Sequence, residues 1–150
     1  MPEIVGLLGL FASSFLSATL LPGSSEAALV ALLAMGESHP AFLVSVATAG
    51  NVLGSVVNWA MGRFFAHFRD RRWFPVGRRS YDRAAAWYGR MGIWSLLLAW
   101  VPVIGDPLTA VAGALRVDIR TFIVLVTLGK AGRYIFIALA FSGWSSAQLA

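Results

Sequence analysis

Four charged side chains lie in stretches of sequence that are otherwise apolar. Two are acids, Glu26 and Asp106, and each follows a proline by four residues. Two are bases, Lys130 and Arg133, and their spacing of three residues puts them on one face of a helix. Because one charge costs roughly 2.5–3.5 kcal/mol at the centre of a membrane helix, we expect all four to face one polar cavity. There they can form ion pairs, take up protons or bind an anion.

Two interpretations of these charges remain open. In the structural one, two buried salt bridges hold the fold together. In the functional one, a proton on either acid leaves the cluster net positive, which favours a phosphate headgroup. Asn51, Ser55 and Asn58 add a polar stripe on one helix face, which either bonds to a neighbouring helix or lines the cavity. We count Asn51 with the site.

The composition indicates an integral membrane protein. The chain has 150 residues, of which 58% are hydrophobic, and a mean hydropathy of +0.73. This exceeds what a soluble domain carries. Cysteine is absent, and His39 and His67 form no ligand cluster, so we predict no metal and no cofactor. Nucleophile-elbow and phosphate-loop motifs are absent too, which argues against an enzyme.

The first acid follows a helix break at Pro22-Gly23. Proline lacks an N–H and glycine is permissive, so a helix ends here. Ser24 or Ser25 is then expected to cap the next helix.

The segment after this break is too short to cross a membrane. Residues 24–35 span about 18 Å as a helix, whereas residues 4–21 are about long enough for a bilayer. The alternatives are a full span with a stub or a re-entrant hairpin with its tip at Pro22 and Gly23. We favour the hairpin, because it places Glu26 in a protein-lined cavity.

The second acid lies in a matching break. Residues 92–115 are apolar but are interrupted at Pro102, Gly105 and Pro107, around Asp106. Arginines flank both ends of this segment, which predicts a second hairpin that enters and leaves on the same side.

Two further segments read as full spans. Residues 41–62 contain Gly50 and Gly54, a spacing that lets two helices approach closely. Residues 121–141 form the last span, and we expect the polar tail 142–150 to fray.

A basic segment, residues 63–91, separates the two halves. It carries eight arginines, including those on a predicted amphipathic helix at 80–90. In a membrane protein this indicates a cytoplasmic loop rather than a nucleic-acid interface. Both chain ends are then expected on the opposite side.

The halves repeat each other with opposite orientation. Residues 4–62 and 92–141 each comprise a hairpin and a spanning helix, and Glu26 aligns with Asp106. One residue's gap later, Gly50-Asn51 aligns with Gly129-Lys130. The predicted fold is a single all-α integral membrane domain built as an inverted repeat, which is typical of secondary transporters.

These motifs resemble the DedA/VTT family of membrane proteins, and most closely its short YqaA-like branch. The likeness covers nearly the whole chain and is strongest at residues 21–26 and 103–109. It implies two re-entrant hairpins and a role in moving polyprenyl-phosphate carriers or phospholipids. By position, Glu26 and Arg133 match functional residues of the family. The chain departs at Gly105, where many relatives carry arginine. Either Lys130 or Arg133 would therefore hold a phosphate here, or the chain binds something else.

The predicted function is therefore a DedA-type transporter or flippase of a bacterial inner (cytoplasmic) membrane, with several spans. Its expected partners are membrane lipids, a lipid phosphate, protons and a second copy of the chain. The alternative is a non-catalytic assembly or homeostasis factor whose buried charges are structural.

Overall fold

The computed structural model describes residues 2–18, 23–36, 38–68, 70–72 and 76–148, and every regular element in these ranges is helical. The all-α prediction is therefore confirmed. The elements in chain order are α1 (Pro2–Ser17), α2 (Ser24–Met35), α3 (Pro40–Phe65), the short 3-10 helix η1 (Ala66–Phe68), α4 (Arg78–Met91), the 3-10 helix η2 (Gly92–Trp100), α5 (Gly105–Ala114) and α6 (Ile119–Gln148).

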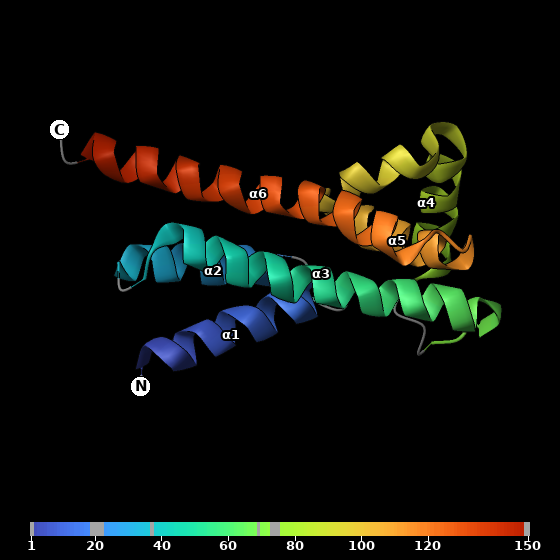
Figure 1. Cartoon of the computed structure of the whole chain (residues 1–150), viewed down its shortest axis with the longest axis horizontal. Helices are drawn as coiled ribbons and strands as arrows, with labels where there is room; N and C mark the ends of the chain where they lie inside the picture. The colour runs from blue at the N-terminus through green and yellow to red at the C-terminus, as the bar shows by residue number, and fades with distance from the viewer. Residues whose placement is uncertain (1, 19–22, 37, 69, 73–75, 149–150) are drawn as a thin grey trace.

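Two long helices set the length of the molecule. α3 and α6 run side by side along its long axis (Figure 1). Both are long and apolar enough to cross a membrane, with mean hydropathy values of 1.6 and 1.7 over their most apolar windows. At 1.5 Å per residue each exceeds the roughly 30 Å of a hydrocarbon core. α6 continues to Gln148, so the expectation of a frayed tail is wrong for residues 142–148.

Each long helix is accompanied by a helical hairpin of about half its length. α1 and α2 pack on each other, as do η2 and α5, and the first helix of each pair ends near the middle of the molecule (Figure 1). Pro22 lies outside the described residues. Gly23 is the N-cap of α2 in a left-handed conformation (φ 96°), and no side chain caps this helix. The capping role predicted for Ser24 or Ser25 is therefore wrong, since glycine provides the turn itself.

The second hairpin turns at residues 101–104, which include Pro102. Val103 has a φ of 73°, a strained conformation for a β-branched residue. Gly105 and Pro107, predicted as parts of the tip, instead lie in the first turn of α5. Proline is tolerated there because the first turn of a helix needs no N–H donors.

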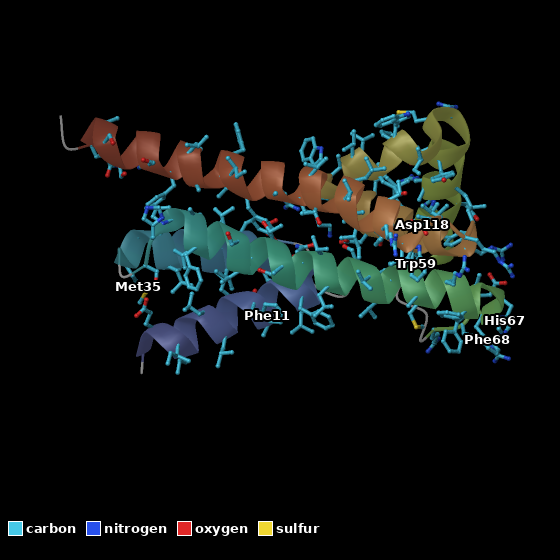
Figure 2. The ribbon with its side chains drawn as sticks, in the orientation of Figure 1. Phe11, Met35, Trp59, His67, Phe68 and Asp118 are labelled. Carbon is cyan, nitrogen blue, oxygen red and sulfur yellow. The ribbon has the colours of Figure 1, made fainter. Side chains whose placement is uncertain are left out.

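α4 lies across one end of the long helices (Figure 1). Its apolar face, centred on Tyr81 and Ala84, is buried against Leu108 and Val111 of α5. The helix predicted at 80–90 is therefore present but longer, and its apolar face packs on protein. Many side chains with nitrogen atoms (blue in Figure 2) lie at the end of the molecule that carries α4, where His67 and Phe68 are labelled. Met35 lies at the opposite end.

Glycines allow the closest helix contacts. A Cβ at Gly50 would lie 2.5 Å from the carbonyl oxygen of Phe11, and one at Gly54 would lie 2.6 Å from that of Phe15. Both contacts join α3 to α1. Where α3 crosses α5, Gly113 has no room for a Cβ because the carbonyl group of Trp59 occupies that space.

We predict that Gly113→Ala destabilises the fold. The new methyl group meets backbone that cannot rotate away, so the helices must separate at a cost of about 1–3 kcal/mol. Thermal unfolding of the purified protein in detergent measures this loss. The control is Gly89→Ala on α4, where a Cβ meets nothing within 4 Å and helix propensity should improve. Equal stability of the two variants would contradict the close crossing.

Candidate functional site

Two ion pairs meet on the middle of α6. Arg133 pairs with Glu26, which lies in the first turn of α2. Lys130 pairs with Asp106, in the first turn of α5, with 3.0 Å between Nζ and Oδ1. The lysine side chain is 5% exposed and the aspartate side chain 31%, so this pair is buried on its basic side and reachable on its acidic side. The structure thus brings the four predicted charges together from both hairpins and one long helix.

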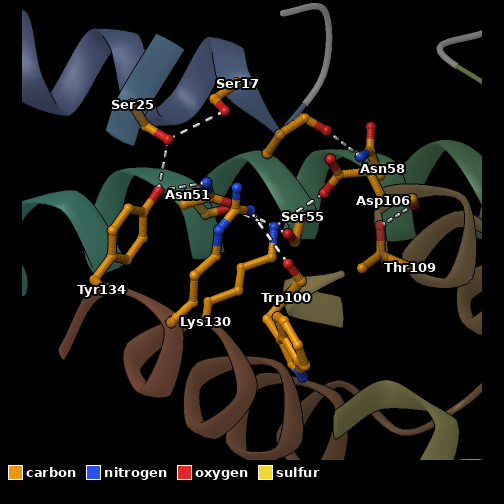
Figure 3. A network of polar contacts seen from close by, with 12 residues as sticks. Ser17, Ser25, Asn51, Ser55, Asn58, Trp100, Asp106, Thr109, Lys130 and Tyr134 are labelled. Atoms are coloured by element: carbon orange, nitrogen blue, oxygen red, sulfur yellow. Dashed lines mark hydrogen bonds and ion pairs between the residues drawn. The ribbon is translucent and has the colours of Figure 1, made fainter. Parts of the chain in front are cut away.

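A chain of hydrogen bonds leads from one ion pair to the other, and Figure 3 shows it from Lys130 as far as Ser25. Lys130 donates to Oδ1 of Asn51, and Nδ2 of Asn51 donates to the hydroxyl of Tyr134 over 2.7 Å. Tyr134 donates to Ser25 over 2.9 Å, and Ser25 donates to Oε2 of Glu26 over 3.1 Å. Every donor in this order points from the ammonium group towards the carboxylate. The polarity is the one that favours both charges at once.

This chain of hydrogen bonds from Lys130 to Glu26, which we call the relay, is buried. Tyr134 is 1% exposed, and Asn51 and Ser25 are also buried. Ser17 of α1 lies 3.2 Å from the hydroxyl oxygen of Ser25, so the first arm of the hairpin joins the network as well. Removing any hydroxyl here leaves neighbouring polar groups without a partner in a low-dielectric setting.

Polar side chains also donate hydrogen bonds to carbonyl groups at the ends of the hairpins' first helices. Nδ2 of Asn58 on α3 donates to the carbonyl oxygen of Ala18, just after the end of α1, over 2.8 Å. Nη1 of Arg133 on α6 donates to the carbonyl oxygen of Trp100, the last residue of η2, over 3.2 Å. Carbonyl groups at a helix end have no partner within the helix, so each hairpin receives one from a long helix.

The remaining predicted residues have structural contacts. Gly23 begins α2, and Gly50 and Gly54 contact α1. Gly105 is buried with the backbone of Ala99 where its side chain would be. An arginine has no space at that position unless the hairpin changes.

Sequence reasoning missed Tyr134 and the role of Ser25. Tyr134 follows Arg133 directly, but one tyrosine in an apolar span carries no distinguishing signal. Its position four residues after Lys130 puts both on one face of α6, which is the only clue that the spacing offers. Within the described ranges, no three histidine, cysteine or acidic residues are grouped so as to hold a metal ion.

We predict that Tyr134→Phe lowers stability by about 1–3 kcal/mol, because Asn51 and Ser25 lose their shared partner. Combining it with Ser25→Ala should cost less than the sum of the two single changes, because both act on one network. Unfolding in detergent gives the energies. Tyr88→Phe on α4 is the control and should stay within about 0.5 kcal/mol of wild type. Strictly additive losses would show that the relay does not act as a unit.

Comparison with known proteins gives one family. A family model described as the VTT domain matches residues 21–143. The inner membrane protein YqaA of Escherichia coli (strain K12) is 48% identical over 140 residues, which cover 93% of this chain and 94% of YqaA. YqaA of Shigella flexneri matches equally well.

A more distant relative is an uncharacterized protein of Haemophilus influenzae, which is 38% identical over 133 residues, 84% of this chain and 81% of that protein. No solved structure matches. The model match and the identity to YqaA confirm the resemblance drawn from the hairpin motifs. The chain therefore belongs to the VTT-domain (DedA) family, as an inner-membrane protein.

Proposed function

We propose that this protein is a lipid transporter of the flippase or scramblase type, which moves a lipid with a phosphate headgroup between leaflets. The two hairpins act as re-entrant elements, and their tips and α6 form the binding site. Protonation of Glu26 or Asp106 then controls the affinity of the site for the anionic headgroup.

The observation that carries this proposal is the meeting of both hairpins at Lys130 and Arg133. Each acid lies in the first turn of a hairpin's second helix, and each pairs with a base on α6. Neutralising one acid leaves its base with excess positive charge in the middle of a candidate span. A phosphate is the kind of anion that such a base binds through charge-assisted hydrogen bonds.

An inverted repeat is supported by contacts between aligned positions. Asn51 and Lys130 occupy equivalent places in the two halves, and they bond to each other. Their neighbours behave alike: Gly50 contacts α1, and Gly129 contacts η2, each the first arm of its own hairpin. Contact between equivalent residues is expected near the axis of a two-fold repeat, which is where transporters of this kind bind substrate.

We predict that the purified protein, reconstituted in liposomes, accelerates exchange of a fluorescent phospholipid between leaflets, and that Glu26→Gln abolishes this while the protein stays folded. The loss follows because an uncharged amide can no longer alternate between pairing with Arg133 and releasing it. Fluorescence that becomes accessible to dithionite measures the exchange. Asp118→Asn, at an exposed turn before α6, is the matched acidic control and should keep full activity.

The structural alternative predicts a different pattern. If Glu26 and Arg133 form only a structural pair, then Glu26→Gln combined with Arg133→Gln should recover both the stability and the activity lost by each single change. Recovery of both would remove the transport role of these charges.

A second prediction concerns orientation. The end that carries the basic loop is cytoplasmic, and the α2–α3 turn lies on the other side. Cysteines at Gly36 and Arg72, both exposed, should therefore react with an impermeant maleimide from opposite faces of the membrane. Labelling of both from one face of intact spheroplasts would contradict the inverted repeat.

A further inference from the structure

A pocket opens on the side of the molecule next to the ion pairs. It has a volume of about 480 Å³ and lies between η2 and α6. Its lining is apolar apart from one charged residue, and comprises Leu97, Trp100, Leu128, Gly129, Gly132, Arg133 and Phe136. We call it the η2–α6 groove. Its volume is within the range of pockets that bind small ligands.

The groove faces the surroundings rather than the protein interior. Leu128 is 61% exposed and Phe136 is 72% exposed, on the outer rim. α6 is a candidate span, and in a membrane these side chains would contact lipid chains rather than water. Arg133 lies at the middle of α6, so a membrane-spanning α6 would place the groove at mid-depth in the bilayer. A lipid can reach this place from the side without passing through an aqueous entrance.

When Glu26 carries a proton, Arg133 gives the groove a preference for an anion. Its guanidinium contacts Glu26 and the carbonyl oxygen of Trp100. A guanidinium has five N–H donors, so these two contacts leave donors for a phosphate. The groove thus joins an apolar wall to a positive group, as a lipid joins an acyl chain to an anionic headgroup.

A second lateral groove offers a comparison. It lies between α3 and α6 and is larger, at about 580 Å³, with Ser45, Thr48 and Thr127 among its lining residues. No charged side chain lines it. Volume alone would favour this groove, but only the η2–α6 groove complements a charged headgroup.

We propose that the η2–α6 groove is the lateral binding site of an anionic lipid, which lays one acyl chain against Leu97, Leu128 and Phe136 and presents its phosphate to Arg133. This inference rests on the proposed function and locates the entrance that the function requires. Gly132 is the position that keeps the groove open, since a Cβ placed there meets nothing within 4 Å. Its neighbour Gly129 has another reason to be small, because a Cβ there would lie 2.6 Å from the carbonyl oxygen of Leu97.

The test fills the groove without disturbing the fold. Gly132→Leu projects a side chain into the pocket, and the open space around Gly132 predicts a folded protein. Gly143→Leu is the matched control, on the same helix, outside the groove and also free of clashes. The probe is phosphatidic acid with a diazirine on one acyl chain, mixed into phosphatidylcholine vesicles that contain the purified protein. Mass spectrometry locates the photo-crosslinks.

We expect crosslinks on η2 and α6 around Leu97, Leu128 and Phe136 in the wild type and in Gly143→Leu. In Gly132→Leu they should fall about tenfold, which corresponds to about 1.4 kcal/mol. A diacylglycerol probe with the same chain, which lacks the phosphate, should label the wild type more weakly than phosphatidic acid does. Unchanged labelling in Gly132→Leu, or labelling mainly at the α3–α6 groove, would overturn the proposal. Equal labelling by the two probes would overturn the role of Arg133.

These experiments distinguish a failure of the proposed binding site from a failure of the proposed transport function. Crosslinks in the groove with no lipid exchange by the wild type would support the groove and reject the proposed function. Lipid exchange by the wild type without crosslinks in its groove, and at the same rate in Gly132→Leu, would reject the groove and support the proposed function.

Discussion

The backbone of a broken helix must find hydrogen-bond partners wherever water is absent, and the rest of this structure follows from that constraint. α1 and η2 both end near the middle of the molecule, beside two helices long and apolar enough to cross a membrane, and lipid offers no hydrogen-bond donor. Asn58 supplies one to the carbonyl group of Ala18, and Arg133 supplies one to that of Trp100. The long helices therefore carry polar residues at mid-length because the hairpins require them. A buried network of hydrogen bonds between the hairpins and the long helices is the consequence.

Arg133 satisfies this constraint with a charge, and the charge creates a second requirement. A guanidinium that is largely buried in the middle of an apolar helix needs a counter-ion, and Glu26 provides it from the other hairpin. One side chain thus ties the end of η2 to the start of α2. Anything that changes the charge of Glu26 also acts on the residue that holds Trp100. Chemistry at the acid and the packing of the second hairpin are in this way linked by a single side chain.

Much of this arrangement was predictable from local sequence rules. A proline followed four residues later by an acid, twice in apolar sequence, predicted two broken helices with charges to be paired. The cost of a bare charge in lipid then predicted that Lys130 and Arg133 would meet these acids. Other features depend on three-dimensional packing. Gly23 rather than a serine begins α2, Pro107 falls inside α5, and α6 runs through residues 142–148. Tyr134 joins Asn51 to Ser25 across 83 and 109 residues of sequence, a distance that no local pattern encodes.

The two halves share a plan but differ in charge. Where α6 carries Lys130 and Arg133, the aligned positions of α3 carry Asn51 and Gly54. Gly54 approaches α1 so closely that no side chain fits, whereas Arg133 borders an open groove. An arginine at position 54 as well as at 133 would, with Lys130, put three cations beside two acids. Its side chain would also force α3 and α1 apart. One side of the molecule is therefore tightly packed at Gly54, while the other, next to the charges, has an open groove.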